Sequence, residues 1–425
     1  MTATEAAGAR AGAAIGTGAA TGAGAGVPLV HAAGEAFDVG FQHGVARADA
    51  LHAFIDDGLC RINRLAPTPV SLTSLRPALA AYGAAIAAAT PRLSEEIDGL
   101  ARGAGISREL AVLLQVRREI IGFRRVPARG DCTTYASRSA GPGGGPVLAQ
   151  TVDLNGDLDD QIAVLDVALS GSGRRALVLS FGGLLGYLGV NSDGLAIGLN
   201  LVLGGEWRTG LPPYLAIRHL LDHAGCVADA LAMLRDLPLA SSRSLTLCDP
   251  ENVACVEILD NHLRFVTTAQ PAHTNHFLHP DFAAFDALNV FARNSSLLRL
   301  KACEAGLASF AGAGPHSGPA TAAGTGNVGG SVAEHFALLS RPPICVADSG
   351  DIRRERTVAA VVVLPDRGEL HVRPGDPARS ATATFRFPTS ARLRPTPTPT
   401  PTPTPLATPL ATQPRASGPA QAVRS

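Results

Sequence analysis

The chain changes character at Cys132, and this change constrains the fold more than any other feature. Before it, apolar residues recur at helical spacing, as in Leu51, Phe54 and Ile55, which predicts a helix from Phe37 to about Leu65. Ser94 is the expected N-cap of a later helix in the same region. After it, apolar runs typical of strands dominate, joined by turn signals such as the Asn191–Gly194 segment. Helices return around 214–237 and 287–309, and further strands follow each of these helical regions. Strands that return through hairpins favour antiparallel sheets covered by helices, so the sequence predicts an α+β protein.

Cys132 itself lies between a turn signal and a predicted strand, in Arg129-Gly-Asp-Cys-Thr-Thr-Tyr-Ala-Ser137. A second strand, Pro146-Val-Leu-Ala-Gln-Thr-Val-Asp153, follows a glycine-rich connector that is typical of a hairpin loop. We therefore expect the thiol and the Asp153 carboxylate at nearby ends of paired strands. A lone cysteine is also often a small buried apolar residue, so this pattern alone leaves both interpretations open.

Composition excludes several classes of function. The 36 basic and 36 acidic side chains cancel, which disfavours nucleic acid or an anionic membrane surface as a partner. The seven cysteines are scattered without a CxxC pair, which favours reduced thiols in a cytoplasmic protein. No signal peptide, membrane span, GxGxxG motif or P-loop is indicated. His273, His276 and His279 could bind zinc, but strand geometry turns 273 and 276 to opposite faces, so we expect no metal site.

Several short motifs, in this order, resemble the cysteine-type N-terminal-nucleophile (Ntn) hydrolases related to acyl-coenzyme A:isopenicillin N acyltransferase, peptidase family C45. They are Asp131-Cys-Thr-Thr134, Gln150-Thr-Val-Asp153, the Gly-Val-Asn191-Ser-Asp-Gly-Leu-Ala run and His273-Thr-Asn275-His-Phe277. The resemblance covers residues 27–380 approximately. It implies a four-layer αββα sandwich, with two antiparallel sheets between helical layers.

The resemblance also implies a mechanism and a set of site residues. Cys132 matches the family nucleophile, freed by cleavage of the Asp131–Cys132 bond, so that its new α-amine acts as the base. Asp153 matches the active-site aspartate, and Asn275 matches the oxyanion-hole amide. The family's arginine near the C-terminal strands is assigned to Arg356, with Arg354 and Arg341 as alternatives.

Composition and the resemblance together predict the organisation of the chain. Residues 1–26 and the Pro/Thr-rich tail 391–425 are expected to be disordered low-complexity segments. Residues 27–131 form the N-terminal pro-segment, and 132–390 form the nucleophile-bearing part of the same domain. Asn191 and Asn200 are read either as structural amides or as polar groups aimed at a site.

The predicted activity is transfer of an acyl group from an acyl-cysteine intermediate to an amine or to water. No cofactor is expected, although acyl-coenzyme A is a possible acyl donor, and the partners are a small-molecule acyl donor and an amine acceptor. Two alternatives stay open: a plain N-acyl amide hydrolase, and an unprocessed, non-catalytic Ntn-like scaffold with a Pro/Thr interaction tail. Sequence departures support the scaffold, because the family's usual Asp-Gly before the cysteine is Gly130-Asp131 here and Val346 replaces an arginine after Cys345.

Overall fold

The computed structural model describes residues 26–122, 132–138, 145–267, 271–312 and 330–388. All but the last residue of the predicted low-complexity N-terminus and the whole Pro/Thr-rich tail lie outside these ranges, as does the Asp131 side of the predicted cleavage site. The helices are α1 (Ala36–Asp56), α2 (Ile62–Leu65), α3 (Leu72–Ala89), α4 (Pro91–Ala104), α5 (Arg108–Ile121), α6 (Pro213–His223), α7 (Val227–Leu234), α8 (Pro280–Ala283), α9 (Val290–Gly312) and α10 (Val332–Leu339).

Two sheets occupy the middle of the described structure. The first sheet has the order β1-β4-β5-β6-β7-β8-β9-β10, and the second has the order β11-β2-β3-β12-β13-β14. The strands are β1 (Leu29–Gly34), β2 (Thr133–Arg138), β3 (Pro146–Leu154), β4 (Ile162–Leu169), β5 (Arg175–Phe181), β6 (Leu188–Asn191), β7 (Ala196–Leu201), β8 (Arg243–Cys248), β9 (Val253–Leu259), β10 (His262–Phe265), β11 (Ala272–His273), β12 (Arg356–Leu364), β13 (Glu369–Pro374) and β14 (Ala383–Arg386).

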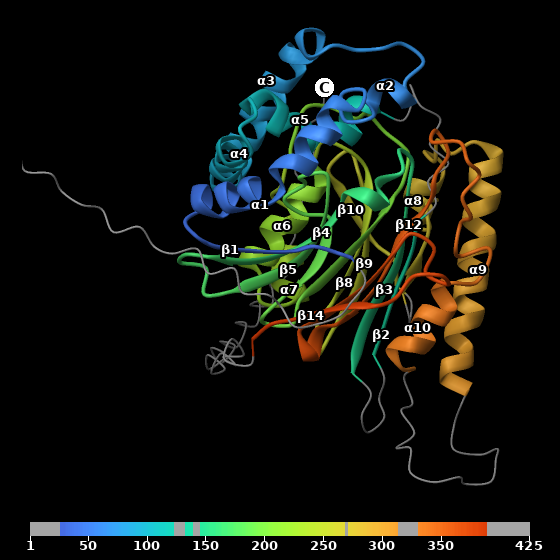
Figure 1. Cartoon of the computed structure of the whole chain (residues 1–425). Helices are drawn as coiled ribbons and strands as arrows, with labels where there is room; N and C mark the ends of the chain where they lie inside the picture. Colours follow the sequence, from blue (N-terminus) through green and yellow to red (C-terminus); the bar gives the residue numbers. More distant parts are fainter. Residues whose placement is uncertain (1–25, 123–131, 139–144, 268–270, 313–329, 389–425) are drawn as a thin grey trace, which may run out of the picture. The chain divides into compact units, whose positions relative to one another are not determined.

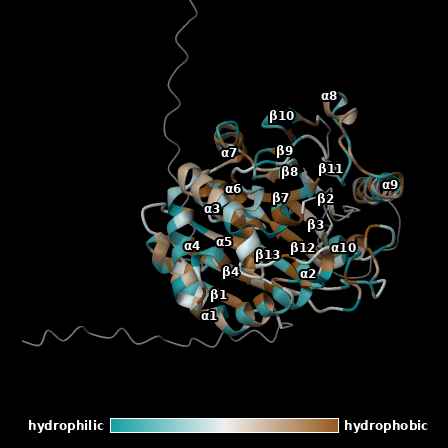
Figure 2. Cartoon of the chain, turned by 90° about the horizontal axis from the view of Figure 1, so that it is seen from above, coloured by the Kyte–Doolittle hydropathy of each residue, from teal (hydrophilic) through white to brown (hydrophobic). Residues whose placement is uncertain are grey.

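The sheets pack face to face between two helical layers. Strands β2 and β3 of the second sheet contact β7 and β8 of the first. Helices α1 and α6 cover the outer face of the first sheet, whereas α9 and α10 cover the second (Figure 1). The central strands are coloured hydrophobic in Figure 2, because strands buried on both faces lack polar alternation. The predicted α+β class with two sheets between helices is confirmed.

One strand pair departs from the predicted antiparallel pattern. β1 pairs with β4 in parallel, with Leu29 opposite Val164, while the other pairs in the described sheets are antiparallel. Parallel neighbours need a long connection, and the whole helical region α1–α5 and the β2–β3 hairpin lie between these two strands in the sequence. The N-terminal segment is thereby built into the edge of the first sheet.

The first predicted helix ends earlier than its apolar pattern suggested. α1 stops at Asp56, and Leu59, Cys60 and Arg61 have φ values of 55°, 57° and 62°. Left-handed backbone costs free energy for residues with a Cβ, so this turn must be held by other contacts. Arg61 supplies them, because its guanidinium donates to the Asp160 carboxylate and to the carbonyl oxygen of Gly156. The apolar spacing predicted a helix as far as Leu65, because spacing alone gives no indication of a left-handed turn.

The start of α4 also differs from the prediction. Ser94 was expected to cap this helix, but α4 begins at Pro91 after Thr90. Proline suits a first helical position because its missing N–H would have no partner there. Ser94 instead lies inside the helix, where its hydroxyl accepts a hydrogen bond from Arg108 at 2.9 Å.

Helices α1 and α4 pack with their backbones in contact, which glycine alone permits. A Cβ added at Gly40 would lie 1.9 Å from the carbonyl oxygen of Glu96, and one at Gly99 would lie 2.0 Å from that of Phe37. Beside this contact, Arg218 of α6 is fully buried and pairs with Glu96 at 2.9 Å. The glycines thus set how closely α1 and α4 approach each other.

Candidate active site

Cys132 lies immediately before β2, and its thiol meets the end of β3. The β2–β3 register places Thr133 opposite Thr151, so Cys132 falls beside Asp153 as the hairpin signal predicted. The Sγ atom lies 3.8 Å from the main-chain carbonyl oxygen of Asp153, to which it donates. Cys132 is 3% exposed and Asp153 is 2% exposed, so both sit in a water-poor environment.

The Asp153 carboxylate is held by two threonine hydroxyls. Thr357 on the neighbouring strand β12 donates to Oδ1 at 2.7 Å, and Thr151 on β3 itself donates to Oδ2 at 3.3 Å. Hydrogen bonds of this kind stabilise a buried carboxylate and fix its orientation. The sequence identified Asp153 but gave no sign that Thr357, distant along the chain, would hold it.

The carbonyl oxygen of Cys132 is bound by two side chains from other elements. Asn200 at the end of β7 donates from Nδ2 at 3.0 Å, and Arg299 in α9 donates from Nη1 at 2.7 Å. Arg299 also donates to the Thr133 hydroxyl at 3.1 Å. These contacts fix the backbone at the nucleophile position. Of the two readings of Asn200, the structure gives it a place beside Cys132.

Asn275 reaches this centre through Arg299. Its Oδ1 accepts from Arg299 Nη2 at 2.9 Å, while its Nδ2 donates to the carbonyl oxygen of Leu201 at 2.8 Å. The predicted oxyanion amide is therefore part of the same hydrogen-bonded network. The side-chain N–H group of Asn275 is therefore directed at the main chain of Leu201 and not at Cys132. Arg299 was missed from sequence, because it sits in an apolar helix near Leu297 and Leu300 without a surrounding motif.

The structure does not bring Arg356 to this centre. Its guanidinium pairs with Asp157 at 3.0 Å and with Asp159 at 2.5 Å, and it does not line the pocket described below. The arginine that contacts Cys132 is Arg299, from α9 rather than from the late strands. The alternative choices do not line that pocket either; Arg354 lies near Asp351, and Arg341 follows α10.

The three histidines considered as metal ligands have separate partners. His273 hydrogen-bonds Glu257 at 2.8 Å, which supplies the carboxylate partner that the sequence did not reveal. His276 hydrogen-bonds the Ser296 hydroxyl at 2.7 Å, and His279 caps α8. In the described part of the chain, no group of three histidine, cysteine or acidic residues is arranged to hold a metal ion.

Cys132 and Asp153 line a pocket whose other walls include residues of α1, α5, α6 and the first sheet. Its cavity volume is small, about 60 Å³. Its walls are mostly apolar and aromatic, with a small number of polar groups, as is usual for small-molecule sites. The apolar and aromatic lining residues are Phe54, Leu114, Leu154, Leu158, Phe181, Leu184, Tyr187, Leu199, Leu201 and Tyr214.

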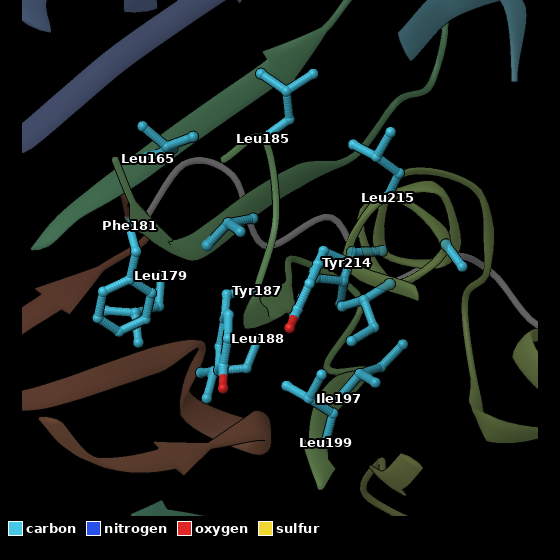
Figure 3. Packing of buried hydrophobic residues seen from close by; sticks show 14 of the residues in the cluster. Leu165, Leu179, Phe181, Leu185, Tyr187, Leu188, Ile197, Leu199, Tyr214 and Leu215 are labelled. Atoms are coloured by element: carbon cyan, nitrogen blue, oxygen red, sulfur yellow. The ribbon is translucent and has the colours of Figure 1, made fainter. Parts of the chain in front are cut away.

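An aromatic stack forms the wall nearest the thiol. Tyr187 and Tyr214 stack with ring centroids 5.3 Å apart, and Phe181 meets Tyr187 edge-on at 5.1 Å (Figure 3). The Tyr187 hydroxyl is close enough to Cys132 for their pKa values to influence each other. Sequence analysis missed Tyr187, because an aromatic residue within an apolar run is normally read as core.

Burial raises the pKa of the Cys132 thiol to about 12, and the negative charge of Asp153 acts in the same direction. In the uncut chain the thiol is therefore protonated near neutral pH. A nucleophile in this place needs a base or a nearby positive charge to become reactive.

The fold and site define a two-sheet α+β protein with a buried cysteine beside an aspartate in an apolar pocket. Residues 140–311 match the family described as acyl-coenzyme A:6-aminopenicillanic acid acyl-transferase. The 40 kDa form of acyl-coenzyme A:6-aminopenicillanic-acid-acyltransferase from Emericella nidulans is 27% identical over 259 residues, 58% of this chain and 68% of that protein. The family resemblance predicted from the motifs is confirmed. Asp153 lies within the matched segment, whereas Cys132 precedes it.

Two of the solved structures that resemble this chain are an acylase and a hydrolase by name. Penicillin V acylase from Agrobacterium tumefaciens is 15% identical, with a TM-score of 0.38 over 60% of this chain and 86% of that one. A mutant form of the conjugated bile acid hydrolase from Clostridium perfringens is 9% identical, with a TM-score of 0.39 over 60% of this chain and 97% of that one.

None of the helices that the structure describes is long and apolar enough to cross a membrane.

Proposed function

We propose that this protein is a self-processing cysteine acyltransferase or amide hydrolase of the Ntn type. The supporting observation is the placement of Cys132. Its thiol faces the Asp153 end of β3 in an apolar pocket, and its own carbonyl is fixed by Asn200 and Arg299. The matched family and the Emericella nidulans relative are acyltransferases by name, which supports an acyl-transfer reaction.

Processing would divide the chain into residues 1–131, which contain the pro-segment, and residues 132–425, which carry the nucleophile. The Cys132 sulfur attacks the carbonyl carbon of Asp131, and the peptide nitrogen leaves with a proton as the α-amine of Cys132. Water then hydrolyses the resulting thioester and releases the Asp131 carboxylate. The freed α-amine has an ordinary pKa of about 8, so it can take the thiol proton that the buried site otherwise retains.

In the reaction on substrate, the same sulfur attacks an amide or thioester carbonyl. The leaving amine or thiol takes a proton from the Cys132 ammonium, and an acyl-cysteine remains. An amine acceptor or water then attacks this thioester and restores the thiol. Asp153 orients the site, and Arg299, which is held by the Asn275 side chain, supplies a hydrogen-bond donor at the nucleophile.

Trapping the acyl-cysteine tests this proposal directly. Purified protein is mixed with a short-chain acyl-coenzyme A or an N-acyl amide, quenched in acid and mapped by peptide mass. The proposal expects the acyl mass on the peptide that contains Cys132. Products formed with and without an added amine then separate transferase from hydrolase. Absence of acylation at Cys132 with either donor class, by a protein that binds them, would reject the mechanism.

A further inference from the structure

Two arginines of α5 line the Cys132 pocket without a carboxylate partner of their own. The lining includes three arginines, Arg117, Arg118 and Arg243. Arg243 is satisfied by neighbours, because it pairs with Glu119 at 3.3 Å and donates to the carbonyl oxygen of Ser242 at 2.6 Å. Within the described ranges, neither Arg117 nor Arg118 forms an ion pair. The positive charge available to a ligand therefore lies on these two residues.

Arg117 keeps an unused donor in this wall. Its Nε donates to the carbonyl oxygen of Cys60 at 2.6 Å, and its guanidinium lies 5.8 Å from the ring centre of Phe54. Its Nη2 is buried and has no hydrogen-bond partner among the residues described. Burial lowers the pKa of Arg117 to about 10. A buried donor without an acceptor costs free energy, which a bound acceptor would recover.

Arg118 contacts a main-chain carbonyl and an aromatic ring. Its Nη1 donates to the carbonyl oxygen of Gly122 at 3.1 Å, and its guanidinium lies 5.3 Å from the Trp207 ring centre. Burial lowers the pKa of Arg118, and nearby Glu355 only partly offsets this effect. Glu355 and Asp153 are the acidic residues among those that line the pocket. The Asp153 carboxylate accepts hydrogen bonds from threonine hydroxyls. The pocket thus presents guanidinium groups within largely apolar walls.

We propose that Arg117 and Arg118 bind a carboxylate group of the substrate. Guanidinium groups match carboxylate geometry, and apolar walls strengthen the attraction because water is excluded. The inference rests on the proposed function, because it assigns a charge to the molecule that Cys132 acylates or deacylates. The carboxylate belongs either to the amine part of the substrate or to the far end of its acyl chain.

Matched pairs of amides test the charge while keeping size constant. N-hexanoylglycine and N-hexanoylglycinamide differ by a carboxylate on the amine side, and N-benzyladipamic acid and N-benzyladipamide differ by one on the acyl side. We expect the carboxylate member of one pair to be cleaved with a kcat/KM about tenfold or more above its neutral partner, mainly through KM. Whichever pair shows the preference identifies the side that the arginines bind.

Substitutions assign the preference to these residues. Arg118→Gln and Arg117→Gln are each expected to reduce the ratio between the paired substrates severalfold, with smaller changes for the neutral member. Arg76→Gln is the matched control, since Arg76 on α3 forms an exposed pair with Glu109 and lies outside the pocket. If Arg117→Gln does not fold, the same ratios are measured with Arg117→Lys and Arg118→Gln.

The outcomes separate this inference from the proposed function. Equal kcat/KM within both pairs, or an unchanged ratio in both arginine variants, overturns the carboxylate site while Cys132 catalysis stands. If no amide is turned over, the carboxylate site is tested by calorimetry on the Cys132→Ala protein. The affinities of N-hexanoylglycine and N-benzyladipamic acid are compared with those of their neutral partners. Tighter binding of a carboxylate member, lost in Arg118→Gln, supports the site even though the catalytic proposal fails. Equal binding within both pairs rejects the site.

Discussion

At the scale of single residues, the site depends on contacts between side chains far apart in the sequence. Asp153 and Cys132 were predictable because a hairpin brings them together locally. Arg299 and Thr357 were not, because their contacts with the site depend on how α9 and β12 pack around β2 and β3. Arg356 shows the same difficulty, since its sequence position suggested a catalytic arginine but nearby aspartates hold its guanidinium.

Thr357 gives a residue-scale prediction. Its hydroxyl donates to Asp153 Oδ1 at 2.7 Å and accepts from the main-chain N–H of Val346 at 2.9 Å. Thr357→Val removes both bonds at nearly constant volume, and we expect kcat to fall about tenfold because the carboxylate loses an orienting donor. Thr357→Ser keeps the hydroxyl and should retain most activity. Steady-state kinetics with melting temperatures check this, and equal activity of the two variants would refute a role for the hydroxyl.

At the scale of elements, the fold class was predictable and the boundaries were less so. Apolar runs and turn signals identified the β2–β3 hairpin and the helical region before Cys132. The end of α1 at Asp56 could not be seen, because the left-handed turn that follows is held by Arg61 and residues about a hundred positions away. The parallel pairing of β1 with β4 was also invisible, since no local signal records pairing across such a long connection.

The contact between α1 and α4 gives an element-scale prediction. Gly40→Ala and Gly99→Ala each force a methyl group against a main-chain carbonyl, so the helices must separate. We expect each change to lower the free energy of unfolding by about 3 kcal/mol or more. Gly83→Ala in α3 is the control, because its nearest neighbour is the end of the Arg108 side chain and alanine favours a helix. Urea denaturation measures the difference. Stability near that of the control would show that the helices are not in backbone contact.

At the scale of the whole molecule, buried His43 predicts how stability depends on pH. Burial, with the charges of Arg218 and Arg47, lowers the pKa of His43 from 6.5 to about 3. The unfolded chain therefore binds this proton near pH 6.5, whereas the folded chain does not. Between these values the unfolded state binds more protons, so the free energy of unfolding falls as the pH is lowered, by up to about 1.4 kcal/mol per pH unit.

Replacing His43 isolates this contribution. His43→Gln cannot take up the proton, so its free energy of unfolding should fall less steeply between pH 6.5 and pH 4.5 than that of the wild type. His219 and His276, whose pKa values burial also lowers, leave part of the dependence in both proteins. Chemical denaturation at both pH values gives the comparison. If the free energy of unfolding fell equally in the two proteins, His43 would not be a buried, neutral side chain in the folded state.

The central claim concerns the whole chain, because an N-terminal nucleophile requires that the polypeptide be cut before Cys132. Intact mass of the purified protein, beside a Cys132→Ala variant, measures this most directly. The account predicts two wild-type fragments, 1–131 and 132–425, and one uncut chain in the variant. A single uncut chain in both would contradict the Ntn mechanism and leave either an internal cysteine hydrolase or a non-catalytic scaffold.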